Sequence, residues 1–315
     1  MALTNEYTII GIDGGGTHTR GVLVRDDKVI SHASSGTARI GSVGVGEACE
    51  RTLNIILELC NKAEIETSEL DAVVVGLAGV WLEEEKKRAA QLLRTLARQQ
   101  SIQLGDLLVT SDAELAIEGA LGNSDGIITI VGTGSIGLAR IGKNQLYRCG
   151  GWGIELDDEG SGAWIGREGL TAVVRALDGR GKPTELTAKI PQFSPIIDMD
   201  RPRTIVKAYQ DRAFEYHNLT PAVMECAVDG DEVCLEIITR AANHLLELPV
   251  ALSKYFKTKT IKVALMGGII EANTLLAQML KDRINEHGKF EIIEPSGSAL
   301  DGAISIGRRL IEQDM

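Results

Sequence analysis

The stretch GIDGGGTHTR, residues 11–20, places three successive glycines between two apolar segments. An apolar run at residues 7–12 precedes the glycines and an alternating run at residues 20–25 follows them, which predicts two strands joined by a glycine turn. A turn at residues 26–28 and a return at residues 29–33 add a third strand. Backbone N–H groups of such a glycine turn can point at a phosphate, because no Cβ is in the way. A tight structural turn is the alternative, since glycine-rich turns are common.

The same pattern returns at an offset of 118 residues, the separation of Thr17 and Ser135. An apolar run at residues 126–131 leads into GTGSIG at residues 132–137, and a second hairpin turns at residues 142–144. Self-similarity on this scale predicts two copies of one structural unit. Strands and helices alternate beyond both copies, so we expect an α/β fold with two domains.

Composition limits the possible partners. The chain has 315 residues and a formal net charge of −11, which disfavours nucleic acid and anionic membranes. The longest run of apolar residues and glycine, residues 72–82, is too short to span a bilayer. Five cysteines without a CxxC pair are typical of a reducing compartment. We therefore expect a cytoplasmic protein with no nucleic-acid or membrane partner.

Two acidic residues follow predicted strands. Asp13 ends the first strand, where its carboxylate could hold Mg²⁺ through water. Asp112 follows a short strand at residues 107–110 and precedes a helix that begins near residue 113. Functional groups of α/β proteins often lie at such strand ends. Asp is also a favoured helix N-cap, and from the residues alone the N-cap role is the stronger interpretation of Asp112.

Two further glycine segments are candidates for ligand contact. Glycines surround Trp152, and acidic residues 157–159 follow; a Trp in this setting offers an apolar face to a sugar ring. A buried Trp anchor before a helix with an acidic N-terminus explains the segment equally well. Gly267 and Gly268 follow a strand at residues 261–265 and could approach an adenine or ribose, although an ordinary strand-to-helix turn is favoured for them alone.

Helices are predicted around these segments. Residues 201–216 and 232–256 are read as helical, and Pro249 is expected to interrupt the second of them.

Together these segments resemble the N-acetylglucosamine kinase family, sugar kinases allied to the BadF/BadG/BcrA/BcrD ATPases with the actin-like ATPase fold. The resemblance covers nearly the whole chain in order and is most specific in CGGWGIELDDEGSGAWIGREGL, residues 149–170. The other matching segments are GIDGGGTHTR (11–20), TSDAELA (110–116), GTGSIG (132–137), VALMGGIIEAN (263–273) and SGSALDGAI (296–304).

The resemblance implies two ribonuclease-H-like domains with an active-site cleft between them. The first domain would comprise residues 1–114 and 298–315. The second would comprise residues 115–297 and carry a helical insertion. We also expect a homodimer.

The resemblance further implies an ATP-dependent kinase that phosphorylates N-acetylglucosamine, with the 6-hydroxyl as the expected acceptor. Asp112 would take the proton from this hydroxyl, and Asp13 would position Mg²⁺ through water. The residues expected to contact ATP are Gly15, Gly16, Thr17, Thr133, Gly134, Ser135, Gly267, Gly268 and Asn273. Those expected to contact the sugar are Arg39, Gly151, Trp152 and Asp158.

Two departures from the family pattern concern the sugar. Arg39 lies near the place where such kinases usually carry an Asn, and Asp157 replaces a common Gly. N-acetylmuramic acid and glucosamine are therefore alternative substrates. Arg39 could pair with a carboxylate such as the lactyl group of N-acetylmuramic acid, although a solvated surface Arg is the simpler interpretation.

An activator-type ATPase of the same fold is a second alternative. Such a protein holds an iron–sulfur cluster and needs paired cysteine ligands. Here Cys149 is the cysteine close to glycines, and it belongs to the sugar-type segment. The sequence therefore favours the kinase.

Overall fold

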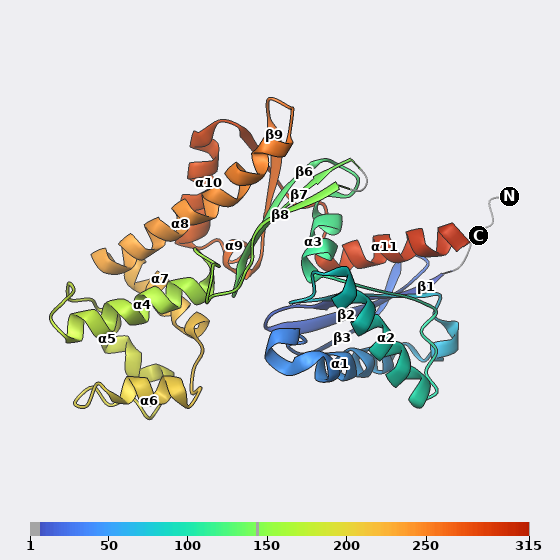
Figure 1. Ribbon diagram of the computed structural model, residues 1–315, viewed down its shortest axis with the longest axis horizontal. Helices are drawn as coiled ribbons and strands as arrows, with labels where there is room; N and C mark the ends of the chain where they lie inside the picture. The colour runs from blue at the N-terminus through green and yellow to red at the C-terminus, as the bar shows by residue number, and fades with distance from the viewer. Residues whose placement is uncertain (1–6, 143–144, 315) are drawn as a thin grey trace. The chain divides into compact units, whose positions relative to one another are not determined.

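The computed structural model describes residues 7–142 and 145–314. These form two compact units, Met1–Ser124 with Pro295–Met315 and Asp125–Glu294. Each unit is built on one five-stranded sheet with helices packed against it (Figure 1). Of the turn predicted at residues 142–144, Lys143 and Asn144 lie outside the described residues.

The first sheet has the strand order β3-β2-β1-β4-β5. β1 is antiparallel to β2 and parallel to β4, and β4 is parallel to β5. The carboxyl ends of β1, β4 and β5 therefore meet at one edge of the sheet. The bounds are Thr8–Gly14 (β1), His18–Arg25 (β2), Lys28–Gly36 (β3), Ala72–Leu77 (β4) and Asp106–Thr110 (β5).

Alternation along these strands sends successive side chains to opposite faces. Ile10 and Ile12 join a buried cluster with residues of α1 and α2. Ile9 lies on the other face and joins a cluster with Ile304 of α11. The helices of this unit are α1 (Ile40–Ala63), α2 (Glu83–Gln99), α3 (Asp112–Leu121) and α11 (Ala299–Asp314), with a 3₁₀ turn at Thr67–Glu69.

The helices α3 and α11 touch backbone to backbone, although they come from distant parts of the chain. A Cβ on Gly119 would lie 1.8 Å from the carbonyl oxygen of Ser298. A Cβ on Gly302 would lie 2.1 Å from the carbonyl oxygen of Leu115. Neither separation is possible for real atoms, so this contact requires glycine on both helices.

The second sheet repeats the first. Its strand order is β10-β9-β6-β7-β8. Starting from β8, two antiparallel pairs are followed by two parallel pairs, and the first sheet has the same order of pairs starting from β3. The predicted duplication is thus confirmed. The bounds are Gly126–Val131 (β6), Ser135–Ile141 (β7), Gln145–Gly150 (β8), Ile261–Met266 (β9) and Phe290–Ile293 (β10).

Seven α-helices and three 3₁₀ turns accompany this sheet in the described part of the chain. The α-helices are Gly162–Leu177 (α4), Leu186–Lys189 (α5), Thr204–Gln210 (α6), Thr220–Val228 (α7), Glu232–Leu252 (α8), Gly268–Glu271 (α9) and Leu275–His287 (α10). The 3₁₀ turns are Ile190–Phe193, Tyr216–Leu219 and Ser253–Tyr255. Within residues 7–142 and 145–314, no helix combines the length and apolar character needed to cross a membrane.

Two helix predictions in this unit are wrong. The helix expected at residues 201–216 is reduced to α6, because Arg212 adopts a left-handed φ of 53° and Phe214 turns into the core. The helix α8 is not interrupted by Pro249 but continues to Leu252. Pro249 lies in its last turn, where the helix loses one hydrogen bond and then ends.

Candidate active site

Asp13 and Asp112 lie at the same edge of the first sheet. Asp13 is the penultimate residue of β1, and Asp112 follows β5 by two positions. The strand β4 runs between them, with Gly76 paired to Asp13 on one side and to Thr110 on the other. A Cβ on Gly76 would lie 3.0 Å from the Cα of Asp112, so glycine lets the start of α3 come close to the sheet.

This environment changes the acidity of Asp112. Its pKa is raised to about 7, mainly because the carboxyl is withdrawn from water, with the negative charge of Asp13 adding to the effect. The Ala113 N–H, which donates to the Asp112 carboxylate at 2.9 Å, and the positive charge of Arg39 act in the opposite direction. A carboxyl with this pKa can exchange a proton near neutral pH.

Asp112 is not the N-cap of its helix, so that prediction is wrong. Ser111 is the cap: its hydroxyl accepts from the Glu114 N–H at 3.1 Å, and Glu114 accepts from the Ser111 N–H at 3.0 Å. The Thr110 hydroxyl also donates to Glu114, and Lys86 pairs with Glu114 at 2.9 Å. This capping box satisfies the helix start and leaves the Asp112 carboxylate available for other chemistry.

Asp13 faces a cation on the neighbouring strand. It is buried, and the Arg20 guanidinium donates to it at 3.2 Å from the directly paired position on β2. Burial raises the pKa of Asp13, and Arg20 partly opposes that effect. Among residues 7–142 and 145–314, no group of three or more His, Cys, Asp or Glu could hold a metal. A magnesium ion here would therefore need oxygen ligands from phosphate and water besides Asp13, which is how Mg²⁺ is commonly bound.

The first glycine turn joins β1 to β2. The Gly15 N–H donates to the His18 carbonyl at 3.1 Å, and Gly16 and Thr17 are exposed. Gly14 has a packing role, since a Cβ there would lie 2.7 Å from the Gly76 carbonyl oxygen. Gly15, Gly16 and Thr17 therefore remain the candidates for phosphate contact.

Arg39 lies in the first unit, in a segment that is bonded to the glycine turn next to Asp13. The Thr37 hydroxyl donates to the Gly15 carbonyl at 3.0 Å and accepts from the Arg39 N–H at 3.0 Å. This bond ties the segment that carries Arg39 to the first glycine turn. The positive charge of Arg39 lowers the pKa of Asp112 and so opposes part of the effect of burial.

The second glycine turn is held by the start of α4. The Gly162 and Ala163 N–H groups donate to the carbonyls of Gly132 and Thr133 at 2.9 and 3.0 Å. The Ser135 hydroxyl donates to the Glu159 carbonyl at 3.1 Å. The turn, with Thr133, Gly134 and Ser135, is thus fixed against the segment between β8 and α4.

Asp158 and Gly267 also adjoin this turn. A Cβ on Gly134 would lie 2.9 Å from Oδ2 of Asp158, so the carboxylate packs directly on the turn. A Cβ on Gly267 would lie 2.5 Å from the Val131 carbonyl oxygen, and Gly267 has a φ of 98°. Gly268 and Asn273 are exposed at the two ends of α9, just beyond Gly267. In the second unit, the candidate sugar residue Asp158 and the candidate adenosine residue Gly267 therefore both lie against the second glycine turn.

Trp152 is exposed, so the interpretation of this residue as a buried anchor is wrong. Its exposed fraction is 68%, and Gly151 before it has a φ of 73°. Arg148 stacks on the indole ring. The sequence patterns did not single out Arg148, and the same holds for Arg20 and Glu114. A signal for Arg148 exists in retrospect, because a basic residue on an edge strand precedes the glycines by two positions.

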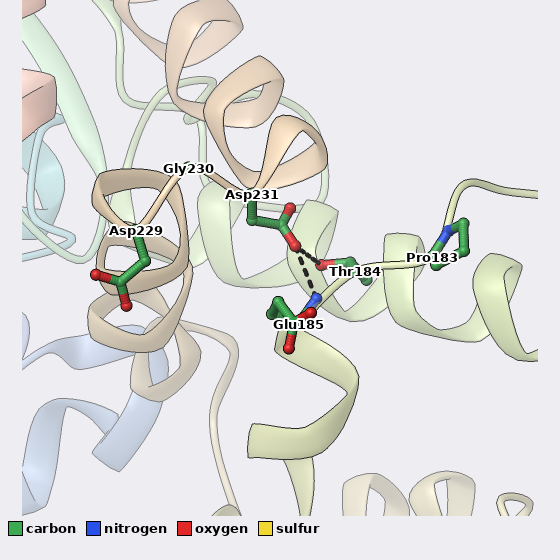
Figure 2. A pocket seen from close by; sticks show the side chains of 6 residues that line it. All are labelled: Pro183, Thr184, Glu185, Asp229, Gly230 and Asp231. Atoms are coloured by element: carbon green, nitrogen blue, oxygen red, sulfur yellow. Dashed lines mark hydrogen bonds between the residues drawn. The ribbon is translucent and has the colours of Figure 1, made fainter.

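A cavity of about 370 Å³ lies elsewhere in the second unit (Figure 2). It is lined by Pro183, Thr184, Glu185, Asp229, Gly230 and Asp231. The Asp231 carboxylate accepts from the Thr184 hydroxyl at 2.9 Å and the Glu185 N–H at 2.7 Å, and it caps α8. These bonds are structural, and none of the predicted site residues lines the cavity.

The site residues thus form two groups, one in each unit, with the two acids in the first and the Trp152 segment in the second. The family model of the BadF/BadG/BcrA/BcrD ATPases matches residues 10–307 of the chain. The chain belongs to the BadF/BadG/BcrA/BcrD ATPase family. The match covers both glycine turns and Asp112, and membership implies that ATP is the nucleotide.

Relatives of this ATPase-family chain include sugar kinases. The N-acetylmuramic acid/N-acetylglucosamine kinase of Clostridium acetobutylicum is 30% identical over 304 residues, which are 95% of this chain and 98% of that protein. Glucosamine kinase GspK of Vibrio cholerae is 27% identical, with 94% of each chain covered.

A solved structure is also similar. The crystal structure of a candidate N-acetylglucosamine kinase from Chromobacterium violaceum has a TM-score of 0.76 and 26% identity, and 96% of this chain and 99% of that chain are covered. The α/β fold class with two ribonuclease-H-like domains is confirmed by this similarity and by the two matching sheets.

Proposed function

We propose that this protein is an ATP-dependent kinase that phosphorylates a hydroxyl of an amino sugar, with Asp112 as the catalytic base. The observation that carries the proposal is the position of the Asp112 carboxyl, which does not cap its helix and lies at a sheet edge beside Asp13 and a glycine turn. Burial there raises its pKa to about 7. Similarity over 95% of the chain to a kinase of N-acetylmuramic acid and N-acetylglucosamine supports this choice of substrate class.

In this mechanism Asp112 accepts the proton of the sugar hydroxyl while the hydroxyl oxygen attacks the γ-phosphorus of ATP and ADP departs. Phosphoryl transfer needs little covalent help, so the protein acts chiefly by positioning and by neutralising charge. Gly15, Gly16 and Thr17 are proposed to contact phosphates in the first unit, and Thr133, Gly134 and Ser135 in the second. Mg²⁺, when bound, would neutralise phosphate charge, with Asp13 holding it through water.

The substrate proposed first is N-acetylglucosamine, phosphorylated at its 6-hydroxyl, with N-acetylmuramic acid and glucosamine as alternatives. The adenosine is assigned to Gly267, Gly268 and Asn273, and the sugar to Arg39, Gly151, Trp152 and Asp158. An ADP-release assay with ATP and each of N-acetylglucosamine, N-acetylmuramic acid, glucosamine and glucose tests the proposal. Turnover with at least one amino sugar, well above that with glucose, is expected; ATP hydrolysis unaffected by any of them would refute it.

Arg39 decides between the amino sugars in this proposal. A guanidinium in the group that contains Asp112 could form a charge-assisted bond with the lactyl carboxylate of N-acetylmuramic acid. Arg39→Asn is therefore expected to lower the ratio of kcat/KM for N-acetylmuramic acid to that for N-acetylglucosamine by about tenfold or more. Any general effect of the substitution on Asp112 cancels in this ratio. An unchanged ratio would mean that Arg39 is a solvated side chain that does not contact the substrate.

The alternative of an activator-type ATPase is disfavoured by the cysteines. Cys49, Cys60, Cys226 and Cys234 are buried, and burial raises the pKa of each thiol. Such thiols are poor cluster ligands, because ligation requires the thiolate. An iron-dependent visible absorption band in anaerobically purified protein would reverse this conclusion. The homodimer stays a prediction, for which sedimentation velocity is the direct test, and so does the cytoplasmic location.

A further inference from the structure

Trp152 is held in a defined orientation although it is exposed. Single exposed apolar side chains are common, so exposure alone does not indicate a site. The flanking backbone is unusual, however: Gly150, Gly151 and Gly153 have φ values of 75°, 73° and 93°. Only glycine adopts these values readily, which means that the segment follows one specific path to Trp152.

Arg148, on the edge strand β8, fixes that path. Its Nε donates to the Gly150 carbonyl at 2.9 Å, and its Nη2 donates to the Gly151 carbonyl at 3.0 Å. Its Cζ lies 4.5 Å from the centroid of the Trp152 ring. One guanidinium therefore bonds to the two peptide groups that lead to Trp152 and also stacks on the indole.

Asp157 completes the arrangement. Its Oδ2 accepts from the Trp152 N–H at 3.1 Å, so the backbone is held on both sides of Gly151 and Trp152. The charges of Asp157 and Asp158 favour the charged form of Arg148, which opposes the lowering of its pKa by burial. The Asp at 157, which departs from the family pattern, thus has a defined partner in this loop.

We propose that Arg148 is a positioning residue that covers one face of the Trp152 ring and presents the opposite face to the pyranose ring of the substrate. This inference rests on the proposed sugar kinase activity and assigns to Arg148 a role in sugar affinity. A ring that is already immobilised loses less conformational entropy when the sugar packs against it. Lysine cannot replace Arg148, because it lacks the planar fork that reaches two carbonyls while stacking.

Steady-state kinetics of Arg148→Met and Arg148→Lys test the proposal. Both variants are expected to raise KM for the preferred amino sugar about tenfold, while kcat and KM for ATP stay within about twofold of wild type. Arg148→Lys keeps the positive charge, and its kinetics test the proposal even if Arg148→Met folds poorly.

Arg240→Lys is the matched control. The Cζ of Arg240 lies 5.0 Å from the ring centroid of Trp164, which is 3% exposed and cannot serve as a sugar platform. Arg240 also pairs with Glu168 at 2.7 Å. Its replacement is expected to lower the melting temperature and leave KM for the sugar unchanged.

Equilibrium titration by tryptophan fluorescence gives an independent measurement. Adding the amino sugar without ATP is expected to change the wild-type signal, and the change should disappear in Trp152→Phe. In Arg148→Met the sugar Kd should rise about tenfold. A sugar KM and Kd within twofold of wild type in both Arg148 variants would overturn the positioning role alone. A wild-type protein that neither binds nor phosphorylates any amino sugar would overturn the proposed function, and this inference with it.

Discussion

Replacing Asp112 by Asn is expected to lower kcat by about 10²- to 10⁴-fold, the usual contribution of a general base. Asn has nearly the same size and can still accept from the Ala113 N–H, which donates to Asp112 at 2.9 Å in the native protein. It cannot take a proton, so the loss should appear in kcat, with little change in KM for ATP. Single-turnover phosphorylation of the preferred amino sugar measures it directly.

Glu114→Gln is the control for this substitution. Glu114 also carries a carboxylate in the first turn of α3, and Gln can replace it in the capping box with Ser111. Its kcat should stay within a few-fold of wild type. Near-normal turnover by Asp112→Asn would mean that another group accepts the proton.

The same Asp112→Asn variant should be more stable than wild type at pH 8. The folded pKa of about 7 exceeds the ordinary value of 3.8, so between about pH 4 and pH 7 the folded state keeps a proton that the unfolded state has lost, and at pH 8 the folded state must hold an ionised, buried carboxylate. The carboxyl therefore costs stability progressively as the pH rises from about 4 to 7. The full shift corresponds to about 4 kcal/mol. Because Asp112 as a residue is only half-buried by its exposed surface, we expect a smaller effect of about 1–3 kcal/mol.

Melting temperatures at pH 5 and pH 8 check this expectation. The gain from Asp112→Asn should be larger at pH 8 and shrink towards pH 5. An equal gain at both pH values would mean that the pKa of Asp112 is not raised. A combined result, slower turnover and higher stability, is typical of a residue selected for activity at the expense of stability.

Gly119→Ala is expected to destabilise the protein by about 3 kcal/mol or more. Its Cβ would lie 1.8 Å from the Ser298 carbonyl oxygen and 3.2 Å from the Gly302 nitrogen, so α3 and α11 must move apart. These helices cover one face of the first sheet, and their separation would open the packing around Leu115 and Ala303. Thermal melting should show a decrease of roughly 10 °C.

Gly46→Ala is the matched control for Gly119→Ala. Gly46 lies inside α1, and a Cβ there has no atom within 4 Å. Because alanine favours the helix over glycine, this variant should be unchanged or more stable by up to about 1 kcal/mol. If both variants melted within 2 °C of wild type, the glycine contact between α3 and α11 would not contribute to stability as we infer.

The features predicted correctly from the sequence are those encoded locally. Both glycine hairpins and their duplication follow from apolar runs and turn residues that are adjacent in the chain. The position of Asp112 after a strand was also read correctly, whereas its N-cap role was not. Ser111 and Glu114 form a capping box that the sequence contains, and the Asp beside them was assigned the role instead.

The remaining features depend on contacts that no local pattern reveals. Asp13 and Asp112 share one edge because β4 pairs between their strands, and the charge of Asp13 there adds to the effect of burial, which is the main cause of the raised pKa of Asp112. The end of α6 depends on a left-handed Arg212 that lets Phe214 reach the core. The stack of Arg148 on Trp152 depends on three glycine dihedral angles, which propensity does not determine.

The position of α11 has a consequence for how the protein is made. The unit that carries Asp112 needs this helix against β1 and α3, yet the ribosome adds its residues after the whole of the second unit. The usual order, in which the N-terminal domain folds first during synthesis, is therefore blocked. The nascent chain therefore carries β1 to β5 without α11 while the second unit is synthesised, and the unit that contains Asp112 can be completed only after the second unit.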